Sequence, residues 1–441
     1  MESVDRLKSV LHEHREEYIN CLKGLIACDT RLIGHGIEGG REKNGQLYLE
    51  KLLLELGAEV IKEQMTEEVV QKGIDLFGEG NPGHEYTDRY NLIGTFRGTG
   101  QGRSILFDSH IDTLPHGDIG LWETDPFEPT VKDGRLHGLG ASDMKSGLMA
   151  SIMSVKLLKD AGIELPGNVH IWSVVDEHGG GNGTLATVLN GHTADAAVIC
   201  EPSDELINIA HMGFIFFKVA VGGKALHSGM KWLGVNAIEK AMLLIQQLQQ
   251  LEHNWLMRYK HPDLPAPTLN IGEIRGGTAG SIVPDYCEFK LCVHYLPGVM
   301  TRESVTEEVT NAILLRARGD GWLREHQPEI SIYQAGGGFE MSREHPLIGT
   351  AHRAMCSVFG DGVPITGSSA GCDARLLKNI GGIPTVMMGP GHNEQCCKPN
   401  EYVSLDNYLN FILVYALTIL DWCGQPRRSH ASEDGGKASA S

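Results

Sequence analysis

Four short apolar segments in the first half of the chain constrain the fold more than any other feature. They are apolar along their length, are bounded by turn residues, and read YNLIGTF (90–96), SILFD (104–108), NVHIWSVV (168–175) and AAVIC (196–200). A helical pattern at 144–162 lies between the second and the third. Apolar strands that alternate with helices are typical of a parallel sheet buried on both faces. We therefore predict an α/β fold with a mostly parallel sheet and helices on both of its faces.

A different pattern after residue 208 indicates a second domain. Strand, helix, strand, helix and strand follow one another at FIFFKVAV (214–221), 236–252, CEFKLCVHYL (287–296), 304–319 and EISIYQ (329–334). We interpret this series as a smaller α+β domain over 212–335, inserted into a larger domain made of 1–211 and 336–424. A chain of 441 residues is long for a single core, which agrees with two domains. The polar end, 425–441, is expected to be a disordered tail.

Further elements are expected in the larger domain. Helical patterns cover 1–30, 41–60 and 405–422, and IPTVMMG (383–389) has the composition of another buried strand.

Charge, cysteine content and the length of the apolar runs limit the possible partners and the cellular location. The chain has 56 acidic and 38 basic residues and a net charge of -18, which repels phosphate backbones, so we expect no nucleic-acid partner. The longest apolar run, at 411–420, is too short to span a bilayer, and the first residues lack the apolar core of a signal peptide. Ten irregularly spaced cysteines favour a reducing compartment. We therefore predict a cytoplasmic protein without a membrane partner.

Side chains that can bind metal follow three of the buried strands and one glycine-rich loop. They are His110 with Asp112, Asp143, Glu177 with His178, and Glu201. Ligands bind beyond the carboxyl ends of the strands in a parallel sheet, so these side chains are expected to meet at one edge. Taken alone, each has an ordinary role: Asp143 could cap a helix, and a single histidine is more often structural. Together, imidazole and carboxylate groups suit zinc, manganese or cobalt.

The motifs around these residues carry a resemblance to a known family. In order, they are SHIDTLPHGDIGLWETDPFEPTVKDGRLHGLGASDMKSGLMA (109–150), VVDEHGGGNGT (174–184), CEPS (200–203), GGKALHSGMKWLGVNAI (222–238), GGTAGSIVPDYCEFKLCVHYLPG (276–298) and GIPTVMMGPGHNEQCCKPNEYV (382–403). The chain resembles the acetylornithine deacetylase/succinyl-diaminopimelate desuccinylase/carboxypeptidase G family of metallopeptidases, the aminoacylase-like zinc hydrolases, as a divergent member. The resemblance implies a hydrolase of C–N bonds, such as the amide of an N-acyl amino acid or peptide.

The resemblance also implies a role for each site residue. His110, Asp143 and Glu201 hold one metal, and Asp143 bridges to a second. Asp112 orients the His110 ring from behind. Glu177 is the general base that takes a proton from the metal-activated water and then delivers it to the leaving nitrogen.

The smaller domain is implied to be a dimerisation or lid domain. Its His227 matches a family histidine that reaches the active site of a dimer partner and stabilises the oxyanion. The apolar strand at 214–221 has an edge that could pair across a two-fold axis. We therefore predict a homodimer or higher homo-oligomer that acts on a small-molecule substrate.

The second metal site departs from the family pattern. His178 and Cys397 stand where a glutamate and a histidine usually complete that site. Both are capable ligands, and His392, in the same loop as Cys397, is an alternative. The chain is therefore expected to bind one or two divalent metals per subunit, and we favour one that is tightly held.

Two further departures concern the substrate. Ser281 and His294 stand where the family commonly has an asparagine and an arginine that hold the substrate's carbonyl and carboxylate oxygens. Histidine cannot reproduce the bidentate fork of arginine. An alternative substrate is an aromatic amine, because 5-nitroanthranilate aminohydrolase belongs to the same family. A second alternative is a non-catalytic homologue, against which the presence of Glu177 argues.

Overall fold

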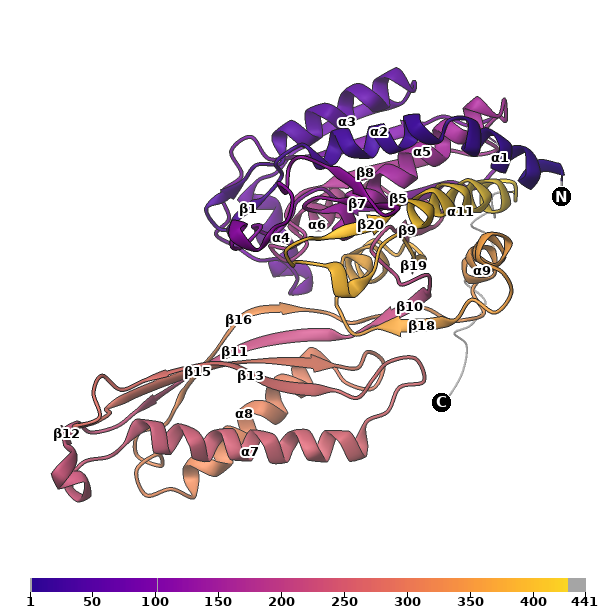
Figure 1. The fold of residues 1–441 in the computed structure, drawn as a ribbon. Helices are drawn as coiled ribbons and strands as arrows, with labels where there is room; N and C mark the ends of the chain where they lie inside the picture. Colours follow the sequence, from indigo (N-terminus) through magenta and orange to yellow (C-terminus); the bar gives the residue numbers. More distant parts are fainter. Residues whose placement is uncertain (1, 101, 427–441) are drawn as a thin grey trace, which may run out of the picture. The chain divides into compact units, whose positions relative to one another are not determined.

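The computed structural model describes residues 2–100 and 102–426, which form two compact units. The first comprises the chain up to Asn208, Met341–Ile365 and the chain from Leu376 onward. The second comprises Ile209–Glu340 and Thr366–Arg375, and its long segment is coloured pink to orange in Figure 1. The sequence pattern placed the two boundaries at 211/212 and 335/336. It did not indicate the segment at 366–375, which is too short to show a periodicity.

The first unit is built on a mixed sheet with parallel central strands. Its strands include, in this order, β10 (Ile207–His211), of which Ile207 and Asn208 belong to this unit, β19 (Thr385–Met387), β9 (Ala197–Ile199), β5 (Ile105–His110), β8 (Val169–Val174), β4 (Tyr90–Phe96) and β3 (Glu59–Gln64). Strands β19, β9, β5 and β8 are parallel to one another, whereas β4 on one side and β10 on the other run antiparallel to them. Strand β3 pairs antiparallel with β4 and so runs in the direction of the central strands. The predicted α/β class is confirmed. The sequence pattern did not indicate the antiparallel strands, because a wholly apolar strand such as β4 has the same composition in either direction.

Helices cover both faces of this sheet, as predicted. Successive side chains of a strand point to opposite faces, so Phe107 and Asp108 of β5 distinguish the two sides. The ring of Phe107 packs on Tyr415 of α11, with 4.9 Å between ring centroids. The carboxylate of Asp108 accepts a hydrogen bond from Thr184 of α6 at 3.1 Å, so α11 and α6 lie on opposite faces. The helices of this unit include α1 (Glu2–Glu13), α2 (Arg15–Ile26), α3 (Lys43–Glu55), α4 (Glu67–Phe77), α5 (Ser146–Asp160), α6 (Asn182–Leu189), α9 (Pro346–Phe359), α10 (Ala374–Asn379) and α11 (Leu405–Cys423).

Two predicted helices differ from the structure. The helix expected at 1–30 is two helices, α1 and α2, which meet at His14. The helix expected at 41–60 is α3, which ends at Glu55, two residues before Gly57 takes a left-handed φ of 80°. The residues that follow form β3, whose largely exposed side chains lack the apolar pattern of a buried strand.

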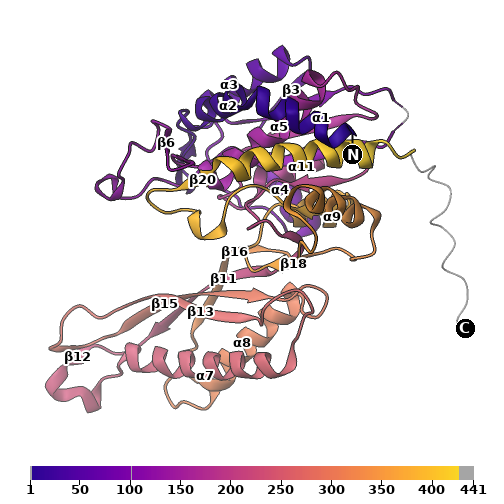
Figure 2. The ribbon, with the colours of Figure 1, turned by 45° about the vertical axis from the view of Figure 1, so that its right-hand side comes forward.

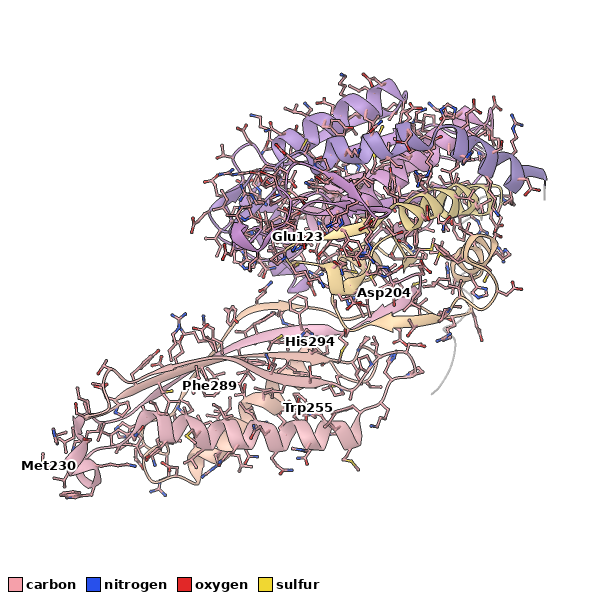
Figure 3. All side chains as sticks on the ribbon, viewed as in Figure 1. Glu123, Asp204, Met230, Trp255, Phe289 and His294 are labelled. Carbon is pink, nitrogen blue, oxygen red and sulfur yellow. The ribbon has the colours of Figure 1, made fainter. Side chains whose placement is uncertain are left out.

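The second unit has a one-sided antiparallel sheet. Its order is β13 (Thr268–Gly276), β15 (Tyr286–Tyr295), β11 (Gly213–Gly222) and β16 (Glu329–Gly336). Helices α7 (Ala237–Arg258) and α8 (Arg302–Arg318) lie along one face of it in both views (Figures 1 and 2). Every second residue of β11 is buried, as expected for a sheet with one covered face. Trp255 of α7 and Phe289 of β15 belong to the core between the helices and the sheet (Figure 3).

Strand β11 contains the apolar segment expected at an edge, and that expectation is wrong. It pairs with β15 along its whole length and with β16 on its other side. Its apolar composition therefore reflects an interior position in the sheet. The edge strands of this sheet are β13 and β16. The sequence pattern did not predict β13, whose side chains are mostly exposed.

The structure describes the first two residues of the predicted tail. The predicted disordered tail starts at 425, but Gln425 accepts a hydrogen bond from the main-chain N–H of Arg103 at 3.1 Å, and Pro426 forms a β-bridge with Gly102. Residues 427–441 lie outside the described residues. Within 2–100 and 102–426, every helix is too short or too polar to cross a membrane.

Candidate metal centre and active site

His110 ends strand β5 and presents one ring nitrogen to two carboxylates. Its Nδ1–H donates to the main-chain oxygen of Asp112 at 2.9 Å, which leaves Nε2 free to act as a ligand. That Nε2 lies 3.1 Å from Oδ1 of Asp143 and 3.4 Å from Oε1 of Glu201. One ligand atom from each of His110, Asp143 and Glu201 lies within 4.8 Å of the others. The donor set and its spacing fit a divalent transition metal.

Asp143 also belongs to a second group of possible ligands. Its Oδ2 lies 3.5 Å from Nε2 of His178 and 3.7 Å from Sγ of Cys397. The distance from that Sγ to Nε2 of His178 is 3.9 Å. The structure thus brings together the two residues that depart from the family pattern, with Asp143 common to both groups. His392, the alternative ligand, is in neither group, and its Nδ1 lies 3.0 Å from Oδ1 of Asp204.

Asp112 serves the site differently from the sequence-based expectation. Its carboxylate lies 3.9 Å from Nδ1 of His110, so the ring of His110 is held by the main-chain oxygen instead. The two carboxylate oxygens accept the main-chain N–H groups of Glu177 and His178, each at 3.1 Å. One of them also lies 3.3 Å from Nδ1 of His178. Asp112 therefore orients the ring of His110 through its main-chain oxygen and the ring of His178 through its carboxylate.

Glu177 lies beside both histidine rings. A carboxylate oxygen of Glu177 and one nitrogen each of His110 and His178 lie within 4.8 Å of one another. The rings of His110 and His178 are perpendicular, with 4.8 Å between centroids. The side chain of Glu177 is only 15% exposed, which places a carboxylate at the rim of the ligand groups with limited access to solvent.

Negative charge around the two imidazoles shifts the pKa values of the site. Burial lowers the pKa of His110, but the charge of Glu201 and the hydrogen bond to Asp143 outweigh burial and hold it well above its usual range. The pKa of His178 is also raised, because its contacts with Asp112 and Asp143 outweigh burial. Burial raises the pKa of Glu201. A divalent cation would compensate the same carboxylates and leave the imidazoles neutral, as metal ligands must be.

Glu401 is a site residue that the sequence analysis missed. It is 1% exposed and accepts the main-chain N–H groups of Gly140, Ser142 and Asp143 at 2.7–2.9 Å. It therefore fixes the loop that presents Asp143. Burial raises the pKa of Glu401 to about 7. A signal was present, because Glu401 closes the Pro-Asn-Glu motif that locates Cys397.

Three further residues of interest lie in the second unit. His227 is exposed on β12 (Leu226–His227), which pairs with β14 (Ile282–Val283), and its Nδ1 accepts the N–H of Gly229 at 3.1 Å. The main-chain oxygen of Ser281 accepts the N–H of Ser228 at 2.8 Å, so Ser281 and His227 are neighbours. His294 is half-buried on β15 (Figure 3), and burial lowers its pKa.

Sequence comparisons identify the family. The model of Peptidase family M20/M25/M40 matches residues 106–421. The N-formyl-4-amino-5-aminomethyl-2-methylpyrimidine deformylase of Bacillus subtilis is 28% identical and covers 96% of this chain and 98% of its own. Its counterpart in Halalkalibacterium halodurans is 30% identical over 77% of this chain and 84% of its own. The acetylornithine deacetylase of Edwardsiella ictaluri is 33% identical over 72% of this chain and 80% of its own.

Solved structures of low sequence identity share the fold. Human carnosine dipeptidase 1 is 17% identical, with a TM-score of 0.73 over 96% of this chain and 99% of its own. A dinuclear metal-binding peptidase of family M20 from Bacillus subtilis is 18% identical, with a TM-score of 0.64 over 93% of this chain and 99% of its own. The family match spans more than half of the chain and agrees with the resemblance of the sequence motifs. This chain therefore belongs to peptidase family M20/M25/M40, and it is a hydrolase of C–N bonds.

Proposed function

We propose that this chain is a divalent-metal-dependent amidohydrolase that removes a small acyl group, such as formyl, from an amine nitrogen of a small molecule. The observation that carries the proposal is the position of Glu177 beside His110 and His178, next to two ligand groups that share Asp143. A relative that aligns with nearly the whole chain is named as a deformylase of an aminomethylpyrimidine, which supports a small acyl group such as formyl. The presence of Glu177 and the hydrolase relatives argue against the non-catalytic alternative.

The proposed mechanism assigns a task to each residue of the site. His110, Asp143 and Glu201 would hold one metal, and Asp143, His178 and Cys397 a second. Bound there, zinc, manganese or cobalt would supply the Lewis acidity that makes water nucleophilic near neutral pH.

Glu177 moves the protons in this mechanism. Its carboxylate takes one from the attacking water, whose oxygen adds to the amide carbon while the π electrons move to the carbonyl oxygen. The C–N bond then breaks, and Glu177 gives the proton to the departing nitrogen. The products of a formamide are the free amine and formic acid, which releases its proton to give formate.

The two metal positions differ in what surrounds them. His110 is 2% exposed, whereas Cys397 is exposed. A thiol at the surface is open to exchange and oxidation. This difference supports one tightly held metal with His110, Asp143 and Glu201 and a weaker second position.

The charge of His294 bears on the substrate. His294 stands where the family arginine binds a substrate carboxylate, and a neutral ring there supports a substrate that lacks this carboxylate. Burial lowers the pKa of His294, so its ring is neutral at pH 7 and cannot pair with a carboxylate as a guanidinium does. Its Nδ1 is buried and has no hydrogen-bond partner among the described residues.

We expect kcat/KM for an N-formyl aminomethyl heteroaromatic compound to exceed that for N-acetylornithine by at least about 10²-fold, because a site built for a neutral group leaves a carboxylate unpaired. The measurement is a parallel kinetic screen of the two substrates. His294→Arg is expected to narrow the ratio, and His294→Gln, which stays neutral, to preserve it. A preference for N-acetylornithine in the unmodified protein would contradict the proposed substrate. Turnover of aminobenzoates alone would favour the aromatic-amine alternative.

We further propose a homodimer in the cytoplasm, formed through the second unit. Exposed His227 and the edge strands β13 and β16 support the assembly. All ten cysteines are free, which supports a reducing compartment.

Mixing Glu177→Gln with His227→Ala subunits by co-expression is expected to restore part of the activity, although each variant alone is inactive. A mixed dimer contains one site with both groups intact if His227 acts across the dimer. The measurement is the specific activity of mixed dimers isolated by two affinity tags. A fully active monomer by light scattering, or inactive mixed dimers, would contradict the shared site.

A further inference from the structure

A buried polar group lies behind the turn that carries Glu177 and takes no part in the proposed reaction. We define the Asp176 cluster as Glu42, His84, Tyr86, Arg89, Asp176 and Asn182. We propose that this cluster, through the ion pair of Arg89 with Asp176, positions Glu177 and His178 for catalysis. The proposal rests on the general-base role given to Glu177 above.

Four side chains donate hydrogen bonds to the carboxylate of Asp176, which is completely buried. Its Oδ2 accepts from His84 Nδ1 at 2.7 Å, from Asn182 Nδ2 at 2.9 Å and from Tyr86 OH at 3.1 Å. Its Oδ1 accepts from Arg89 Nη2 at 2.9 Å. Donors from 84–89 and from Asn182 therefore fix both oxygens of the carboxylate in place.

Arg89 is itself held by a second carboxylate. It is 1% exposed, and Oε1 of Glu42 accepts from its Nε at 3.0 Å and from its Nη2 at 2.7 Å. Its Nη1 donates to the main-chain oxygen of Glu85 at 3.1 Å. A buried guanidinium is stable only with such partners, and their geometry fixes the one hydrogen bond that reaches Asp176.

The main chain of the turn is held from two sides. Asp176 takes a left-handed φ of 68°, a conformation that a residue with a side chain keeps only when its surroundings enforce it. A Cβ at Gly179 would lie 2.4 Å from Oδ1 of Asp176, so the turn closes tightly on the carboxylate. On its other side, Asp112 binds the N–H groups of Glu177 and His178. The cluster and Asp112 together fix the main chain from which both functional side chains extend.

Arg89→Met is expected to lower kcat by about 10–100-fold with KM within about twofold, because a displacement of the base by about 1 Å disturbs proton transfer but not substrate contacts. The main-chain N–H groups of Glu177 and His178 are expected to exchange faster with solvent, which is measured by hydrogen–deuterium exchange. Metal content with His110, Asp143 and Glu201 is expected to persist. Arg89→Lys keeps the positive charge but not the forked guanidinium group. Its kcat is expected to lie between that of Arg89→Met and that of the unmodified protein.

A control variant must separate the effect of lower protein stability from the effect of a displaced Glu177. Leu158→Ala removes a fully buried side chain from the second half of α5 and is expected to lower Tm without changing kcat at temperatures where the protein is folded. If Arg89→Met behaves like Leu158→Ala in kcat and in amide exchange, the proposal is wrong. If Arg89→Met does not fold, the same comparison is made with Arg89→Lys. If Glu177→Gln keeps full turnover, the proposed function fails instead.

Discussion

Glu177→Gln is expected to lower kcat by about 10²–10⁴-fold, and by more if the same carboxylate serves both proton transfers, while the fold and the metal content stay intact. Glutamine has nearly the same shape as glutamate but cannot accept the proton of the attacking water. The measurement combines steady-state kinetics on the formamide substrate with circular dichroism and elemental analysis of the purified variant.

The matched control for this result is Glu123→Gln. Glu123 has a side chain that is 71% exposed (Figure 3) and undergoes the same chemical change. Its turnover is expected to equal that of the unmodified protein. If Glu177→Gln kept half of the normal rate, the mechanism proposed here would be wrong.

His110→Ala and Asp143→Ala are expected to lose bound metal and with it nearly all activity, whereas Cys397→Ser loses less. His110 and Asp143 belong to the more buried ligand group, and Asp143 is common to both groups. Removal of one ligand from a site with three protein ligands weakens binding strongly. Elemental analysis after gel filtration through metal-free buffer gives the equivalents retained by each variant.

Cys356→Ser is the control for the thiol, because Cys356 is a free, half-buried cysteine outside both ligand groups. It is expected to retain the metal of the unmodified protein. Two equivalents in the unmodified protein and none in Cys397→Ser would contradict a single tightly held metal. A strong chelator should abolish activity, and added zinc, manganese or cobalt should restore it.

The sequence predicted the α/β class and the site residues at the strand ends for one physical reason. Parallel strands that start at one edge of a sheet also end at a common edge, so residues that follow β5, β8 and β9 meet there. His110 ends β5, and Glu177 and Glu201 follow β8 and β9; the structure brings His110 close to Glu177 and, in a second group, to Asp143 and Glu201. The resemblance to the family added Cys397, whose position no periodicity indicates.

What the sequence could not predict depends on contacts between distant segments. Arg89 and Asp176 are 87 residues apart, and they meet because β4, which follows Arg89, runs antiparallel to β8, which precedes Asp176. The apolar composition of β4 does not indicate that direction. The exposed strands β3 and β13 were missed because edge strands lack a continuous apolar signal. The interior place of β11 was missed because pairing partners cannot be read from the composition of one strand.

The division of the second unit into Ile209–Glu340 and Thr366–Arg375 has a consequence for how the protein is made. On the ribosome, the last residue of that unit emerges before β19 and α11, which complete the sheet and one covering layer of the first unit. The order of synthesis therefore allows the second unit to finish folding while the sheet of the first unit still lacks β19. A gene fragment that ends at residue 340 would encode the second unit without its final ten residues, 366–375.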